Sequence, residues 1–214
     1  MNVLPNAGKI IGDNGQYLLH MACSFRASIE VVQILYETNP TIISTSDDYG
    51  NLPLHLACKT NSSSQVIDFL IEKYPVALQI QNSHYHTPLH LACSNKNSSV
   101  DTIRKLITIY PNATKTVDIN GELPIRHECS KEDIILENLS ALLDANPNSI
   151  WAENIYGITP SYNCNSNDEN KFHHLIKQCI VQGLSVNLIK LLSKNFMSTA
   201  GSWCDEDGNC LLHH

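Results

Sequence analysis

A histidine stands three residues before a cysteine at three evenly spaced places, namely His20 and Cys23, His55 and Cys58, and His90 and Cys93. Residues three apart share one face of a helix, so each imidazole could act as a base toward its thiol. Imidazole and thiolate are also the usual ligands of zinc. Either chemistry requires further groups at defined distances. The spacing of the motif along the chain indicates whether such groups can lie close enough.

The even repetition of the pair argues against nucleophilic catalysis. The three histidines are separated by 35 and 35 residues, and an enzyme seldom needs the same nucleophile three times. A catalytic thiol would also need an oxyanion site beside it. We therefore predict no catalytic residue, and we expect Cys93 and its counterparts to be small buried packing residues.

The same spacing disfavours a metal centre. Structural zinc sites use close ligands such as C-x₂₋₄-C with H-x₃₋₅-H, whereas Cys23, Cys58, Cys93 and Cys129 lie a whole repeat apart. Stacked helices are about 8–10 Å apart, too far for four such ligands to share an ion or to form a ladder of disulfides. The segment "HYH" at 84–86 offers only two ligands. We predict no metal site.

Composition excludes several classes of protein. The chain has 214 residues, a formal net charge of −7 and only 14 Lys plus Arg, without the basic cluster expected of a nucleic-acid binder. No apolar run reaches the roughly 18 residues that span a membrane, and no secretory signal is visible. No glycine-rich phosphate loop is present. We expect an intracellular protein, cytoplasmic or nuclear, with reduced thiols, no membrane contact and no cofactor.

Two further series of residues show that the whole chain is periodic. Prolines at 5, 40, 75, 111 and 147 are spaced by 35, 35, 36 and 36 residues. Ten residues after each proline stands a glycine, except that Tyr85 takes the third place: Gly15, Gly50, Tyr85, Gly121 and Gly157. Series of different residue types with a fixed offset indicate a repeated structural unit.

The third copy shows what one unit contains. Pro88 suits the first turn of a helix, and a short helix over 89–94 follows. After a polar connector, residues 101–110 place apolar side chains at i, i+3, i+4 and i+7, which predicts a second, amphipathic helix. Pro111 ends that helix. A ten-residue loop then leads to the next unit, where glycine favours a turn with positive φ.

The segment "TPLHLAC" at 87–93, "LPLHLAC" at 52–58 and this order of elements resemble the ankyrin repeat. The resemblance covers essentially the whole chain and implies an all-α, ankyrin-like helix–loop–helix solenoid with short hairpin-like loops. It also implies that Thr87 and His90 hydrogen-bond to loop backbone. Units of 35–36 residues and asparagine- or serine-rich connectors depart from the usual pattern.

We expect one array over 1–214, with units near 5–39, 40–74, 75–110, 111–146 and 147–197, an insertion at about 163–172, and a further unit starting over 198–214. The pattern is cut at both ends, so we expect a fragment of a longer array. The fourth copy, "LPIRHEC" at 123–129, leaves its register open. Either Arg126 or His127 takes the place of the motif histidine, and Glu128 stands where alanine is expected.

The resemblance implies a monomeric, non-enzymatic scaffold or adaptor that binds a protein partner through its loop tips and concave face. The alternative is the targeting region of a larger enzyme such as a kinase or ubiquitin ligase. An acidic edge of Asp13, Asp48, Asp118, Glu122, Glu206 and Asp207 predicts a partner with a basic or basic–apolar segment. The predicted partner-binding residues are Asp13, Asp48, Tyr49, Asn51, His84, Tyr85, His86, Asn120, Glu122, Trp151 and Tyr156.

Overall fold

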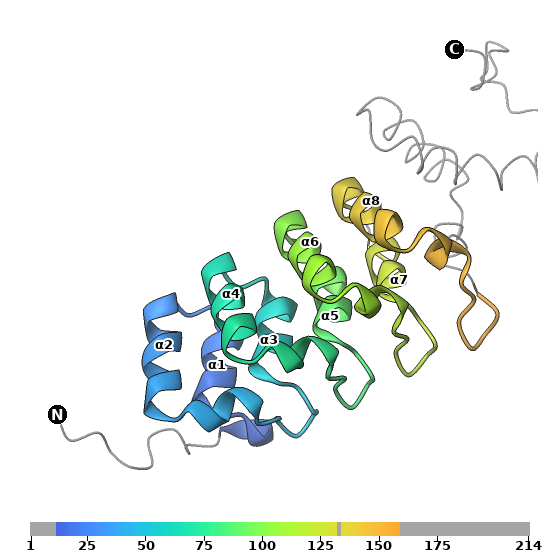
Figure 1. Cartoon of the computed structure of the whole chain (residues 1–214). Helices are drawn as coiled ribbons and strands as arrows, with labels where there is room; N and C mark the ends of the chain where they lie inside the picture. Colours follow the sequence, from blue (N-terminus) through green and yellow to red (C-terminus); the bar gives the residue numbers. More distant parts are fainter. Residues whose placement is uncertain (1–11, 132–133, 159–214) are drawn as a thin grey trace, which may run out of the picture.

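The computed structural model describes residues 12–131 and 134–158, and within this part all regular structure is helical (Figure 1). The short first helices of the units are α1 (Leu18–Ser24), α3 (Pro53–Thr60), α5 (Pro88–Ser94) and α7 (Pro124–Cys129). The longer second helices are α2 (Ile29–Thr38), α4 (Ser64–Lys73), α6 (Val100–Ile109) and α8 (Leu136–Ala145). The predicted all-α class is confirmed.

Each second helix ends before a proline, and that proline opens a five-residue 3₁₀ helix that the sequence did not predict. These are η3 (Pro40–Ser44), η4 (Pro75–Gln79), η5 (Pro111–Lys115) and η6 (Pro147–Trp151). Proline suits the first position because its fixed φ is helical and its missing N–H has no partner there. A further 3₁₀ turn, η2 (Asp13–Gly15), lies at the start of the described chain.

The short helices stack side by side, the second helices form a second layer against them, and the loops project along one edge (Figure 1). The stack is held by apolar side chains that recur at one position per unit and are at most 2% exposed: Leu19, Leu54, Leu89 and Ile125. Full burial of one such side chain contributes about 1.5–3 kcal/mol. No helix in the described ranges is long and apolar enough to cross a bilayer.

The structure assigns the register of the fourth unit. Arg126 is buried, and its guanidinium reaches Glu122 Oε1 at 2.7 Å and the carbonyl of Ile158 at 3.5 Å. The motif histidines make the same kind of contact to the loop 31 or 32 residues later. Arg126 therefore takes the histidine position, and His127 takes that of Leu91.

Glu128 occupies the position of a core alanine and is nevertheless fully buried. Lys131 Nζ lies 2.7 Å from Glu128 Oε2, and the backbone N–H of Ile135 donates to Glu128 Oε1 at 3.2 Å. Lys131 and Asn138 also donate to the hydroxyl of Ser98 in the preceding unit. The residue that departs from the repeat is thus accommodated by a paired, hydrogen-bonded charge, as burial of a carboxylate requires.

Four of the hairpin-like loops are each built on one buried aspartate or asparagine. These residues are Asp47, Asn82, Asp118 and Asn154, and their exposed fractions are 4–8%. In each loop the side-chain Oδ1 accepts the backbone N–H groups two and four residues later, at 2.7–3.0 Å. Backbone hydrogen bonds also join neighbouring loops, for example from Ser83 N–H to Tyr49 C=O at 2.9 Å. The loops therefore form a connected row.

The turn of each hairpin has positive φ, which glycine adopts without strain. Gly50 has φ of 74° and Gly121 has φ of 72°, and Tyr85 adopts the same conformation with φ of 60°. A residue with a Cβ is destabilised by about 1–2 kcal/mol in this region. The exception in the glycine series is therefore a strained tyrosine in an unchanged turn.

We predict that Tyr85→Gly raises the free energy of unfolding by about 1 kcal/mol, because relief of strain exceeds the greater backbone entropy of glycine. Urea denaturation followed by circular dichroism measures it. The matched control is Gly50→Ala, whose new Cβ would lie 2.8 Å from the backbone nitrogen of Ser83 and should destabilise the protein. A destabilised Tyr85→Gly variant would contradict the strain argument.

Candidate functional site

The motif histidines connect structural elements. His90 Nδ1 accepts the backbone N–H of Thr87 at 3.1 Å and lies 2.8 Å from the Thr87 hydroxyl, so the Thr87 side chain contacts His90 rather than the loop backbone that the resemblance implied. Because Nδ1 is an acceptor, Nε2 carries the hydrogen and donates to the carbonyl of Glu122 at 3.2 Å. His20 bonds to Tyr17 N–H and Asn51 C=O in the same way. Both ring nitrogens are therefore occupied by backbone or by the capping threonine.

Burial keeps these imidazoles neutral. His20, His55 and His90 are fully buried. Desolvation lowers the pKa of His55 to about 4 and that of His90 to about 3, although hydrogen bonds to carbonyls oppose the shift. It also lowers the pKa of His20. A neutral imidazole supplies the one acceptor and one donor that this connection needs.

The paired thiols are not activated. Cys23, Cys58 and Cys93 are free, buried cysteines. Burial raises the pKa of Cys23 to about 12 and raises the pKa values of Cys58 and Cys93 well above the ordinary value of a thiol. A nucleophilic cysteine needs a lowered pKa and access to substrate, so these three pairs do not form nucleophilic sites.

The row of hairpin loops presents apolar side chains to solvent. Tyr49 is 48% exposed, Tyr85 55% and Tyr156 68%, and all three lie at hairpin tips. Ile119 and Ile155 are exposed beside the tips of their own loops, and Val117 is exposed just before the hairpin that Asp118 opens. The predicted set of binding residues did not include Val117, Ile119 or Ile155. We call these six residues the hairpin edge.

The other predicted binding residues divide into two groups. Asp48, His84 and Asn120 are exposed on the loops. Asn51 is only 8% exposed, and its amide group bonds to Asp47 and Asn82, so it supports the loops. His86 and Glu122 are partly buried and also contact the next loop. The side chains of Asp13 and Trp151 lie outside the described part of the chain.

The predicted acidic edge is wrong for two of its carboxylates. Asp118 is 4% exposed and holds its own loop, and Glu122 lies against Arg126 at 2.7 Å. Asp48 remains exposed, whereas Glu206 and Asp207 lie outside the described residues. The mistake arose because a loop position alone does not distinguish a buried, loop-forming aspartate from a solvated one.

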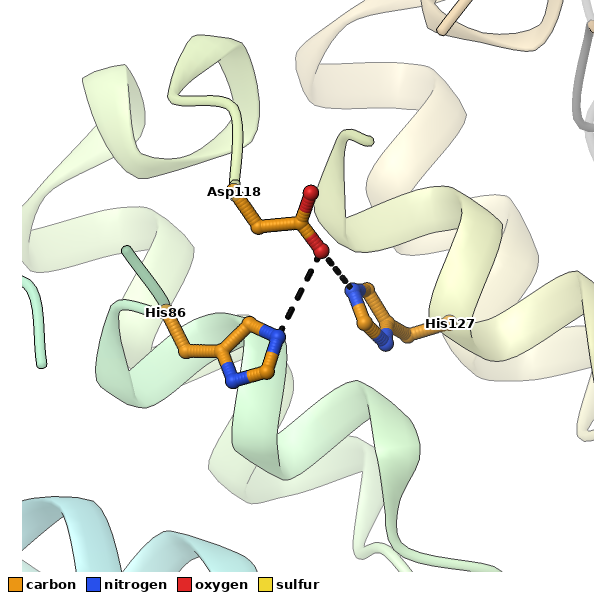
Figure 2. A group of neighbouring side chains, drawn as sticks. All are labelled: His86, Asp118 and His127. Atoms are coloured by element: carbon orange, nitrogen blue, oxygen red, sulfur yellow. Dashed lines mark hydrogen bonds and ion pairs between the residues drawn. The ribbon is translucent and has the colours of Figure 1, made fainter. Parts of the chain in front are cut away.

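Between the third and fourth units, two imidazoles meet one carboxylate (Figure 2). Asp118 Oδ2 lies 3.0 Å from His127 Nε2 and 3.4 Å from His86 Nε2. The rings of His84 and His90 lie 5.8 and 5.7 Å from that of His86. Sequence reasoning found only the pair at 84–86, because the other ligand atoms come from the next unit.

Asp118 is the anionic centre of this cluster. Its own burial raises its pKa, but hydrogen bonds from His127 and from the backbone N–H groups of Glu122 and Asn120 together hold the pKa well below its ordinary value. Burial and the neighbouring His127 lower the pKa of His86. The arrangement therefore combines a carboxylate with an imidazole that favours its neutral form.

Comparison with known families supports the repeat architecture. Residues 40–92 match the family described as ankyrin repeats (many copies), and residues 84–116 match the ankyrin repeat itself. A search of curated proteins found no match to the chain. The two matched segments together cover the second and third copies of the motif and the loop that carries His86.

We predict that the protein loses stability between pH 7.5 and 5.5. The unfolded chain takes up protons near pH 6.5, whereas buried His55 stays neutral down to about pH 4, so protonation favours unfolding in this window. The loss should be about 1 kcal/mol per buried motif histidine. Urea denaturation at both pH values measures it. His55→Gln, which cannot titrate, should show a smaller difference, and an equal difference would refute this cause.

We also predict slow thiol modification of Cys58 and Cys93 in the folded protein, because both are at most 1% exposed and react as thiolates. Labelling with a disulfide reagent, followed by peptide mass spectrometry, reports each cysteine separately. The same reaction in denaturant gives the reference rate. Equal rates in both conditions would show that these thiols are accessible.

Proposed function

Because this chain is an ankyrin-repeat protein, we propose that it is a scaffold or adaptor that binds a protein partner through the hairpin edge and the concave face of the stack. Ankyrin repeats are in general protein-interaction modules. The observation that carries the proposal is the row of exposed tyrosine and aliphatic side chains on neighbouring loops. Aromatic side chains are enriched at the centres of protein interfaces.

The conformation of Tyr85 supports this assignment. A glycine would occupy its positive-φ turn with less strain, yet a tyrosine stands there and is 55% exposed. Strained residues cluster at functional sites, where the function of the side chain explains why a strained conformation is kept. Contact with a bound partner is the function that we assign to the side chain of this tyrosine.

The exposed groups favour an apolar partner segment rather than a strongly basic one. Asp118 is buried and Glu122 is paired with Arg126, so they offer little charge to a partner. Asp48 and Asn120 remain exposed beside the apolar side chains and can supply hydrogen bonds around them. We propose a segment with apolar side chains at its centre and polar groups at its rim, which is the usual composition of an interface.

We predict that replacing Tyr49, Tyr85 and Tyr156 together by alanine weakens partner binding by at least about 100-fold, since central aromatic anchors contribute about 2 kcal/mol or more each. The partner is first identified by affinity capture from native lysate with mass spectrometry. Titration of the purified pair by calorimetry then measures the affinity of each variant.

The matched control replaces two exposed residues of the second helices, Lys73 and Arg104, by alanine. This control should bind the partner normally, and circular dichroism should show unchanged helix content in both variants. Loss of binding in the control together with normal binding in the tyrosine variant would place the interface on the second helices.

A further inference from the structure

We propose that His86, Asp118 and His127 form a binding site for a divalent transition-metal ion, with Zn²⁺ as the favoured ion. The site is independent of partner binding. One nitrogen or oxygen atom from each residue lies within 4.8 Å of the others. His86 closes the third hairpin, Asp118 opens the next one, and His127 lies on α7, so three elements converge (Figure 2).

The carboxylate is fixed before any ion binds. Asp118 Oδ1 accepts the backbone N–H groups of Asn120 and Glu122 at 2.8 and 2.9 Å. This leaves Oδ2 directed at both imidazoles, and the Asp118 side chain is 0% exposed. A metal ligand held in place by other hydrogen bonds loses little freedom on binding.

The cluster is not an inevitable product of the repeat. In the other loops, the second side-chain atom of the aspartate or asparagine contacts one residue of the preceding loop: Asp47 contacts Gln16, Asn82 contacts Asn51, and Asn154 contacts Glu122. The contact of Asp118 with His86 belongs to this series. His127 is additional, because the same place in α3 and α5 holds buried leucine, Leu56 and Leu91.

The distances suit a tetrahedral ion. Bonds of about 2.0–2.1 Å to zinc separate neighbouring ligand atoms of a tetrahedron by about 3.3 Å. The observed separations from Asp118 Oδ2 are 3.0 and 3.4 Å, so small side-chain movements would admit the ion. Two imidazoles and one carboxylate favour zinc and related transition metals over Mg²⁺ or Ca²⁺, which prefer oxygen ligands.

Access is also adequate. The side chains of His86 and His127 are 22% and 17% exposed, so an ion can enter from solvent. Three protein ligands leave a fourth position for water. A bound ion would tie the third hairpin to the fourth unit through coordinate bonds.

The experiment measures Zn²⁺ binding to the full chain by isothermal titration calorimetry in the presence of excess Mg²⁺. His173, His174, His213 and His214 are replaced by asparagine in every sample, so that these adjacent histidine pairs do not contribute. Asp118→Asn keeps the loop, because Asn82 and Asn154 hold theirs with an amide. His127→Leu restores the residue type found in α3 and α5.

We expect one Zn²⁺ per chain in the parent, and affinity lowered at least about tenfold by Asp118→Asn and by His127→Leu. Asp47→Asn changes the equivalent residue of a loop without this cluster and should leave the affinity unchanged. X-ray absorption of the zinc complex should show only nitrogen and oxygen ligands. Circular dichroism checks that each variant is folded.

Three results would overturn the proposal. They are no Zn²⁺ binding by the parent, equal affinity in the parent and both cluster variants, or sulfur ligands in the absorption spectrum. In the first case the cluster is a hydrogen-bonded histidine–aspartate–histidine group, with each Nε2–H donating to the carboxylate, and nothing more.

Discussion

A hydrogen bond from the histidine position of each short helix to the next hairpin recurs along the stack, and it positions the row of loops together with the backbone hydrogen bonds between them. The imidazole at the start of a short helix donates from Nε2 to the carbonyl that closes the following hairpin, as His20 does to Asn51 and His55 does to His86. Its Nδ1 meanwhile accepts a backbone N–H of its own helix start. Since a neutral imidazole is required, burial of the ring and the position of the loop are coupled.

The fourth unit shows that this connection tolerates a different donor when its surroundings change too. Arg126 reaches the carbonyl of Ile158 with a permanent positive charge, and Glu122 lies against that charge. Glu128 is in turn paired with Lys131 beneath the same helix. Buried ion pairs contribute little net stability, but loss of one partner is strongly destabilising. The unit therefore depends on several residues together.

Local patterns were sufficient to predict the repeat, its two helices and its turns. The apolar face of α6 and the positive-φ turns follow from periods and residue types that lie within one unit. The burial of Asn51 and the meeting of His86 with His127 depend on the neighbouring unit, so no pattern within one unit reveals them. One signal was present: Asp47, Asn82, Asp118 and Asn154 each stand seven residues after a repeat proline. Such regularity is typical of structural residues rather than variable binding residues.

Because hydrogen bonds fix each loop relative to the next, the tips of the hairpin edge lie at a fixed spacing. Its tips should follow one another at the spacing of stacked helices, about 8–10 Å. A β-strand covers this distance in about three residues, and successive tips would then face opposite sides of the strand. A polyproline II segment rises about 3.1 Å per residue with three residues per turn, so every third side chain would meet a tip. An α-helix rises about 1.5 Å per residue and would align after nearly two turns. The spacing of the tips thus favours some backbone conformations of a bound segment over others, whatever side chains that segment carries.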